Sequence, residues 1–324
     1  MSEKEHVNHI FNIYSGNNSK TGNGIHGEKS IAASIIVIVA IWTALLLIGD
    51  SGKMSGGLRA EENIVPATME VGDTITFGTY HDEEIEWRVL KLSEDGKEAV
   101  LISQNILCMK AYDAAESGRY SYDKEGNNYF KGSAADIDQQ LQVQVRGNND
   151  WSLSNIRTWL NSSDEVVKYG DQPPISAAMS EGHNDYHNEP GFLYGFRDEE
   201  IDAIKEVENI TSGNKLSGQD TIVTRDKVYL LSLEELKWFE EAGISLLAEP
   251  TQAAIANDGT AWYWYDMEIF SLKTYYWWLR EPVKGAAGKC YVVGTGREEE
   301  NIYKKDVAME GYGIRPVITV YVGK

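Results

Sequence analysis

The chain has 324 residues, 42% of them hydrophobic, which is enough apolar material for one large domain or two ordinary ones. Its formal net charge is -20, and because binding a nucleic-acid backbone requires clustered lysine and arginine, a nucleic-acid partner is not expected. The 2 cysteines are too few for a disulfide-framework protein or a multi-cysteine zinc module.

The N-terminal segment predicts a membrane anchor. Residues 31–48 carry no charged side chain, and at about 1.5 Å per helical residue they nearly span a hydrocarbon core of roughly 30 Å. A buried core helix and a cleaved signal peptide are the alternatives, but the preceding tail is long and no Ala-x-Ala-like exit follows. We therefore expect a disordered tail over residues 1–30, a transmembrane helix over 31–48, a flexible stalk over 49–63 and one domain over 64–324.

The charges that flank the anchor do not decide its orientation. Lys20 and Lys29 precede the segment, and they are matched by Lys53 and Arg59 after it. The positive-inside rule therefore gives a tie.

The domain opens with a pattern of strands. Residues 73–78 and 84–90 alternate apolar and polar side chains, as half-buried strands do. An Asp-Gly pair at 95–96 supplies a turn into a third strand at 99–103. Residues 105–150 are polar and glycine-rich, which is typical of loops and an insertion.

Helices are predicted in the middle of the domain. Residues 151–161 have apolar side chains at helical spacing behind Ser152, a possible N-cap. A second helix is expected from about 198 to 207, because its first turn is acidic and its two isoleucines share a face. A strand over 227–231 then leads into a third helix, which starts at a Ser-x-x-Glu capping box at 232–235.

The final third is β structure again, with strands expected at residues 275–279, 289–293, 302–307 and 314–321. The segment that Gly313 opens is expected to pair within the same sheet as residues 276–279. Strands, then helices, then strands describe an α+β domain.

Four short motifs carry a family resemblance. They are WSLSNIRTWLN at 151–161, TRDKVYLLS at 224–232, YWWLREP at 276–282 and GYGIRP at 311–316. Together they resemble an extracytoplasmic bacterial family catalogued only as domain of unknown function 6273, with a C-type-lectin-like, formylglycine-generating-enzyme-like (sulfatase-modifying factor) fold. The resemblance implies a mixed domain of antiparallel strands and short helices outside a Gram-positive cell, with the tail inside. Arg280 and Arg315 are expected to be buried structural arginines.

The same resemblance raises an enzymatic possibility. Formylglycine-generating oxidases use closely placed active-site cysteines, whereas Cys108 and Cys290 are far apart and lie in no thiolate-stabilising motif. Outside the cytoplasm a Cys108–Cys290 disulfide is permitted, although free cysteine is also among the most buried residue types. Calcium-mediated sugar binding is not supported, because valine follows the Glu-Pro pair at 281–282 where lectins carry an amide.

His183 and His187 form the one cluster with metal-ligand chemistry, together with the acidic residues around them. Prolines on both sides argue against a helix that would align the two imidazoles. We therefore expect a solvated acidic loop that binds no metal tightly, and no cofactor.

The aromatic run Trp262, Tyr263, Trp264, Tyr265, followed by Asp266, is the best candidate for a ligand-binding surface. As a strand, it would present the two tryptophans on one face and the two tyrosines on the other. One face would pack on the core, and the other, beside the carboxylate, could stack on sugar rings or a peptide. Packing of all four rings is the alternative.

The sequence thus predicts a single-pass membrane protein that contacts the bilayer through residues 31–48 and presents its domain outside the cell. We expect that domain to bind a cell-surface glycan or a protein partner, without catalysis. An enzyme of unknown reaction on the same fold, and a structural module of an envelope complex, are the alternatives.

Overall fold

The computed structural model describes residues 63–113, 149–169, 186, 189–213, 220–259, 261–284, 286, 288–297, 301–307, 309 and 311–324. The chain separates into two compact units, Met1–Ala60 and Glu61–Lys324, and all described residues belong to the second. Within those ranges, no helix is long and apolar enough to cross a membrane. The predicted tail, the anchor at 31–48 and the stalk up to residue 62 lie outside them.

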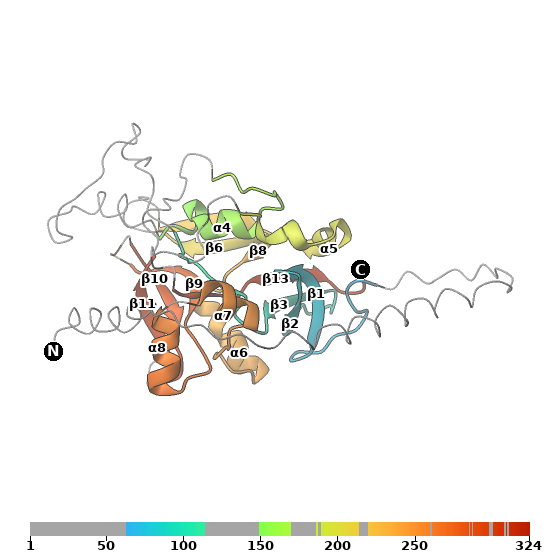
Figure 1. Cartoon of the computed structure of the whole chain (residues 1–324). Helices are drawn as coiled ribbons and strands as arrows, with labels where there is room; N and C mark the ends of the chain where they lie inside the picture. Colours follow the sequence, from blue (N-terminus) through green and yellow to red (C-terminus); the bar gives the residue numbers. More distant parts are fainter. Residues whose placement is uncertain are drawn as a thin grey trace, which may run out of the picture. The chain divides into compact units, whose positions relative to one another are not determined.

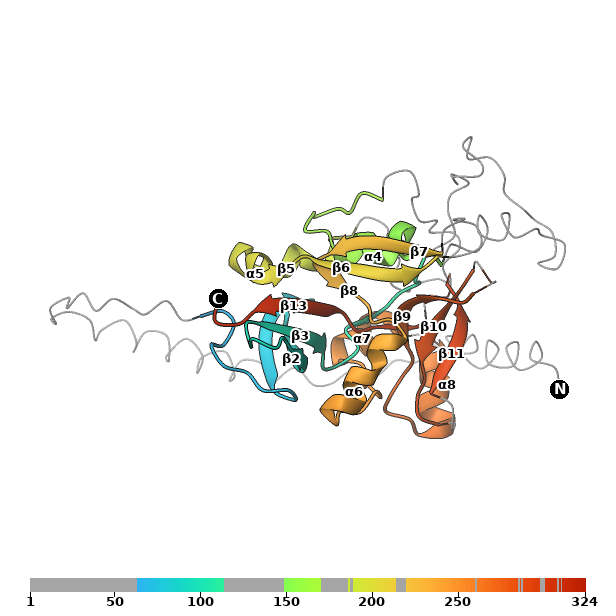
Figure 2. The same cartoon turned by 180° about the vertical axis from the view of Figure 1, so that it is seen from behind.

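A six-stranded sheet joins the start and the end of the domain (Figures 1 and 2). Its order is β1 (Thr74–Tyr80), β2 (Glu83–Leu92), β3 (Glu98–Ser103), β13 (Val317–Tyr321) and β5 (Ile204–Lys205), with β8 (Val228–Tyr229) also paired to β13. Every pair in it is antiparallel. The three strands predicted at the start of the domain are therefore confirmed, and the last strand completes their sheet.

The turn between β2 and β3 shows how the local sequence sets this meander. Gly96 adopts a left-handed φ of 69°, which glycine tolerates without steric cost. The Asp95 carboxylate accepts hydrogen bonds from the Ser93 hydroxyl at 2.8 Å and the Lys97 amide at 3.1 Å. These bonds, with the Ser93 hydroxyl as the largest cause, lower the pKa of Asp95 to about 2.

A second, five-stranded sheet has the order β11 (Ile302–Asp306), β10 (Lys289–Val293), β9 (Trp277–Pro282), β12 (Gly313–Ile314) and β4 (Cys108–Met109). Gly313 pairs with Trp277, so these segments share a sheet, as expected, and they run parallel. The single strand predicted over 314–321 is wrong, however. Pro316 has no N–H to donate to a ladder, so the chain leaves β12 and resumes as β13 in the other sheet.

The remaining elements lie on either side of these strands. They are η2 (Trp151–Leu153), α4 (Asn155–Leu160), η4 (Phe192–Gly195), α5 (Asp198–Ala203), the hairpin β6 (Val207–Ser212) and β7 (Thr221–Asp226), η5 (Glu234–Leu236), α6 (Lys237–Ala242), α7 (Gln252–Asp258) and α8 (Ala261–Phe270). In both views α4, α5 and β6 lie on one side of the strands, and α6, α7 and α8 lie on the other (Figures 1 and 2). Short helices combined with antiparallel sheets confirm the α+β class.

Two helix predictions need correction. The helix expected at 151–161 divides into η2, capped by Asp150, and α4, capped by Ser154, so Ser152 is not the cap. The helix expected at 198–207 ends at Ala203, because Ile204 leaves it to pair with Val320 in the large sheet. Strand pairing outweighs the helical periodicity at this point, since helix propensity is a weak local preference.

The third helical prediction is confirmed. Ser232 and Glu235 exchange hydrogen bonds, the Ser232 amide donating to the carboxylate at 2.8 Å and the Glu235 amide donating to the hydroxyl at 3.3 Å. The helical segment formed by η5 and α6 then ends at Gly243, whose φ of 65° is left-handed.

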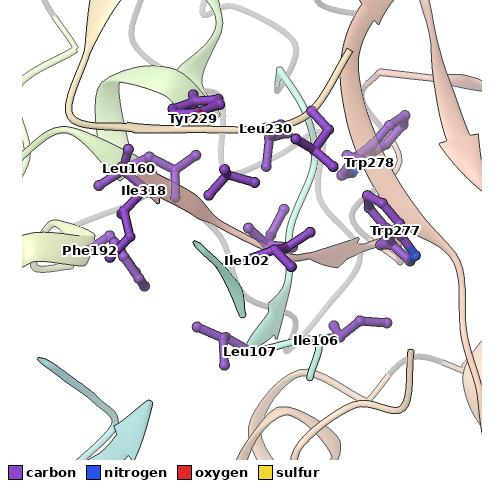
Figure 3. Packing of buried hydrophobic residues seen from close by; sticks show 14 of the residues in the cluster. Ile102, Ile106, Leu107, Leu160, Phe192, Tyr229, Leu230, Trp277, Trp278 and Ile318 are labelled. Carbon is purple, nitrogen blue, oxygen red and sulfur yellow. The ribbon is translucent and has the colours of Figure 1, made fainter. Parts of the chain in front are cut away.

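One hydrophobic cluster connects both sheets with the helices around them. Figure 3 shows Ile102 and Ile318 of the large sheet in the same packed cluster as Trp277 and Trp278 of the second sheet, with Ile102 the nearer of the two isoleucines to the tryptophans. All four side chains are fully buried. Because the two sheets share this core, the described part of Glu61–Lys324 behaves as one packed unit.

The two motif arginines are buried, as expected, and each joins separate elements. Arg315 lies where the chain crosses between the sheets, and its guanidinium donates to the Ser103 carbonyl at 2.9 and 3.1 Å. Burial, followed by the nearby charge of Arg88, lowers the pKa of Arg315 to about 9. Arg280 forms an ion pair with Glu235 and so ties β9 to the capping box.

Candidate functional site

The aromatic run is an α-helix, α8, and the expectation of a strand is wrong. Tryptophan and tyrosine favour strands only where neighbouring strands accept them, and Ala261, Met267 and Glu268 are good helix formers. The helix ends at Phe270, and Ser271 follows it with a left-handed φ of 52°. Neighbouring rings are therefore about 100° apart around a helix instead of alternating between two faces of a strand.

The helix separates the candidate residues into inner and outer positions. Tyr263 is 2% exposed and packs edge-on against Tyr275, with the ring centroids 5.2 Å apart. Trp264 is 49% exposed, whereas Tyr265 and Asp266 are half-buried. The side chain of Trp262 lies outside the described residues. One of the four rings is thus shown to be core and one is shown to be surface.

The outward side of α8 carries large apolar side chains. Ile269 is 56% exposed, one helical turn from Tyr265, and Glu268 is exposed one turn from Trp264. We call these four residues, Trp264, Tyr265, Glu268 and Ile269, the outer face of α8. Large exposed apolar side chains gathered on one element are typical of interaction surfaces.

A second feature lies among β9, β11 and the approach to β12, where three tyrosines enclose one ammonium group. The Lys305 Nζ atom is 5.0 Å from the ring centroid of Tyr276, 5.4 Å from that of Tyr312 and 6.0 Å from that of Tyr303. The Tyr276 ring is nearly perpendicular to the other two, at 81° and 89°. We call Tyr276, Tyr303 and Tyr312 the tyrosine cage. All three distances lie within the range of cation–π attraction.

Asp266 connects the helix to this cage electrostatically. Burial raises the pKa of its carboxyl, and the positive charges of Arg297 and Lys305 oppose the increase. The Arg297 guanidinium also lies 4.0 Å from the centroid of the Phe270 ring, at the end of the same helix. The candidate carboxylate of the aromatic run therefore faces two cations.

The two cysteines are free thiols, so the permitted Cys108–Cys290 bridge does not form. They lie on β4 and β10, three positions apart in the strand order. At roughly 4.8 Å per strand, that separation is about 14 Å, twice the Cα–Cα reach of about 7 Å for a disulfide. Burial is the largest cause that raises the pKa of each thiol, so both remain protonated at neutral pH.

The histidine loop cannot be placed, because His183 and His187 lie outside the described residues. Within the described ranges, no group of three or more His, Cys, Asp or Glu side chains is arranged to hold a metal ion. Glu189, the last acidic residue of the predicted loop, forms an ion pair with the fully buried Lys110.

Lys110 was missed by the sequence analysis. Its ammonium lies 4.8 Å from the Trp159 ring centroid and 4.6 Å from that of Tyr186. A buried lysine requires such partners, since an uncompensated charge in the core is very costly. Its immediate neighbours on β4 are apolar, so the local sequence carried no signal of this role.

Residues 95–322, more than half of the chain, match the family model described as Domain of unknown function (DUF6273). The chain belongs to this family. No curated protein and no solved structure matched it.

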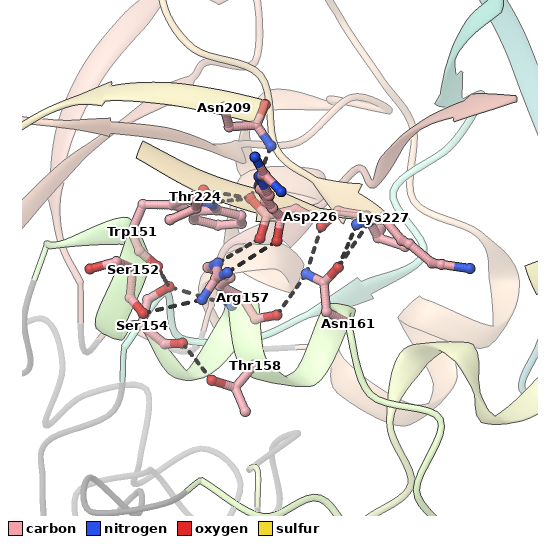
Figure 4. A network of polar contacts seen from close by, with 12 residues as sticks. Trp151, Ser152, Ser154, Arg157, Thr158, Asn161, Asn209, Thr224, Asp226 and Lys227 are labelled. Atoms are coloured by element: carbon pink, nitrogen blue, oxygen red, sulfur yellow. Dashed lines mark hydrogen bonds and ion pairs between the residues drawn. The ribbon is translucent and has the colours of Figure 1, made fainter. Parts of the chain in front are cut away.

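Two of the four sequence motifs, at residues 151–161 and 224–232, meet at one buried carboxylate, Asp226 (Figure 4). It accepts hydrogen bonds from Trp151 Nε1 at 3.0 Å, Arg157 Nε at 2.6 Å, Asn209 Nδ2 at 2.9 Å and Thr224 Oγ1 at 2.7 Å. Four donors, one of which is the paired cation Arg157, satisfy this carboxylate where water cannot reach it. These contacts therefore hold η2, α4 and the β6–β7 hairpin together.

An open hollow of about 400 Å³ lies beside this network. It is lined by Arg157, Thr158, Asn161, Ser162, Ser163 and Asp164. The Asn161 side chain is already bonded within the domain. It accepts hydrogen bonds from the Lys227 and Val228 amides and donates one to the Val228 carbonyl. The lining is a structural junction, and the outer face of α8 and the tyrosine cage remain the stronger candidates.

Proposed function

We propose that this DUF6273 member is a membrane-anchored binding module that presents its domain outside the cell and recognises a protein partner through the outer face of α8. The observation that carries the proposal is the exposure of Trp264 and Ile269 on one short helix. Apolar side chains lie all round α8, so the side that faces solvent is apolar without being covered by the rest of the domain.

The helical form of the run favours a protein over a glycan. A sugar ring would stack on Trp264 and bond to Glu268, but it would leave Ile269 uncovered. A groove on a partner protein would cover Trp264, Tyr265 and Ile269 together, as grooves that receive helices do. Aromatic anchors of this kind dominate binding energy when they are desolvated.

The charge of the chain indicates the chemistry of that partner. Glu268 is exposed within the outer face, and the whole chain carries a net charge of -20. We therefore propose a partner whose apolar groove has a basic rim, since complementary potentials accelerate association and suppress wrong partners.

The state of the two cysteines also favours a binding function over cysteine-based catalysis. The raised pKa values of Cys108 and Cys290 leave neither as a thiolate nucleophile at neutral pH. The resemblance carried by the four motifs implies a C-type-lectin-like domain as the finer description of this α+β fold, and residues 31–48 support the anchor. A lectin-like fold hosts many functions, so the proposal rests on the outer face.

Site-specific photo-crosslinking in the full chain, expressed in its membrane, tests the proposal. A photoreactive phenylalanine analogue replaces Trp264 in one variant and Ile269 in another. A third variant carries it at Tyr194, which is 52% exposed on η4 and serves as the matched control. We expect one protein adduct from the two α8 positions and none from position 194.

The adduct from position 264 should disappear when Ile269→Glu is added, while Val223→Glu, at an exposed position on β7, should leave it unchanged. Absence of any adduct from α8 would overturn the proposal. Adducts of equal yield from all three positions would instead indicate a module enclosed in an envelope complex. Glycan binding that is lost in Trp264→Ala but kept in Ile269→Ala would replace the protein partner by a sugar.

A further inference from the structure

The tyrosine cage is fixed from behind by the fold. The Trp278 ring packs edge-on against Tyr312 at 5.1 Å, and the Tyr275 ring does the same against Tyr276 at 5.4 Å. Gly294 makes room for the third wall, because a Cβ atom there would lie 2.3 Å from the Tyr303 ring. The three rings are thus positioned by packing that does not involve the lysine between them.

The cage differs from the other enclosed ammonium of the domain. Lys110 is wholly buried, lies against Trp159 and Tyr186 and is paired with Glu189, so it is a closed structural element. Tyr276, Tyr303 and Lys305, in contrast, are only half-buried. The cage therefore reaches the surface.

Its lysine lies on a strand at the edge of the sheet. β11 is the first strand in the order of the five-stranded sheet and pairs with β10. A lysine has a long flexible stem, and because side chains take no part in the backbone ladder, this stem can turn outward without breaking the pairing of β11 with β10. The rings that remain would then present electron-rich faces near the Asp266 carboxylate, whose charge acts on both Lys305 and Tyr312.

We infer that Tyr276, Tyr303 and Tyr312 form a binding site for an organic ammonium group, and that Lys305 is the chain's own occupant, displaced by the ligand. Cages of aromatic rings recognise quaternary ammonium groups by the same cation–π attraction that holds the lysine. The site is separate from the outer face of α8, so it adds a small-molecule or headgroup specificity to the proposed protein contact. Lys305 limits affinity, because every ligand must compete with it.

Titration of the full chain in detergent with choline tests this inference, with intrinsic tyrosine and tryptophan fluorescence as the readout. Lys305→Met keeps the apolar stem and removes the competing charge. We expect it to bind choline about tenfold more tightly than the wild type, because it removes an ammonium group that competes for all three rings. Lys304→Met is the matched control, since the Lys304 ammonium lies against Tyr291 outside the cage.

Three further titrations test whether the binding depends on the ligand's charge and on the rings of the tyrosine cage. The uncharged choline isostere 3,3-dimethyl-1-butanol should not bind, and Lys305→Met combined with Tyr303→Leu should lose choline binding. Methylammonium, titrated in parallel, distinguishes a primary-amine source of the ligand from a quaternary one. If Lys305→Met binds choline no more tightly than wild type, or binds the isostere equally, the inference is wrong.

A measurement on the wild-type chain covers the case in which Lys305→Met does not fold. Displacement of Lys305 exposes its amine, so choline should increase the rate at which an acylating reagent modifies Lys305, as measured by peptide mass spectrometry. Modification of Lys304 should be unaffected, and the isostere should have no effect. An unchanged rate for Lys305 at saturating choline would also overturn the inference.

Discussion

Adjacent rings of α8 occupy opposite environments, and this contrast tests the site at the scale of single residues. Trp264→Ala should change the free energy of unfolding by about 0.5 kcal/mol, because its side chain is largely exposed. Tyr263→Ala should cost roughly 3 kcal/mol or more, because it empties a buried position against Tyr275. Chemical denaturation of both variants measures the two values. A large loss in Trp264→Ala would make that ring structural and remove it from the site.

The cysteines give a second prediction for single residues. The folded chain should not react with Ellman's reagent at neutral pH, since burial raises the pKa of both thiols and excludes the reagent. After denaturation without reductant, both free cysteines should react. Cys108→Ser and Cys290→Ser should each leave one reactive thiol. A disulfide would give none until reductant is added.

At the scale of single elements, local sequence patterns predicted some strands and helices correctly and failed for others. Alternation predicted β1 and β2 because each has a solvent-facing side, and the Asp-Gly turn predicted β3. The Ser232–Glu235 box predicted a helix start because both partners are close in sequence. The helix at 198–207 was predicted too long because Val320, its strand partner at Ile204, is distant in sequence. The strand form of the aromatic run failed because tryptophan and tyrosine favour strands only where neighbouring strands accept them, whereas Ala261, Met267 and Glu268 in the same run are good helix formers.

The N-cap of α4 is Ser154 and not Ser152, and the free energy of unfolding of two variants tests this assignment. Ser154 accepts the Arg157 amide and donates to the Trp151 carbonyl, so Ser154→Ala should destabilise the domain by about 1 kcal/mol. Ser152 bonds only to the neighbouring Asp150 side chain through its hydroxyl, and Ser152→Ala should cost about 0.5 kcal/mol or less. Urea denaturation gives both values. The reverse order would restore Ser152 as the cap.

At the scale of the whole molecule, the family motifs act mainly on the architecture. Arg315 lies at the crossover between the sheets, Arg280 joins β9 to the capping box, and Asp226 gathers η2, α4 and the hairpin. The burial of Arg280 and Arg315 could be anticipated from the chemistry of arginine, whereas the role of Asp226 could not. The tyrosine cage could not, because its walls and its lysine come from segments whose proximity depends on the sheet order. Sequence patterns describe single elements well, whereas a site assembled from several strands appears only when their order is known.

The last prediction concerns how the whole chain is placed in the membrane. If residues 31–48 anchor it with the tail inside, protease added to intact protoplasts should digest the domain and spare residues 1–30. Immunoblots against tags at both ends of the chain read the outcome, and permeabilised protoplasts, in which both tags should disappear, are the control. Protection of the C-terminal tag would reverse the orientation. In that case the outer face of α8 and the tyrosine cage would meet cytoplasmic partners, so this experiment decides where any partner must be sought.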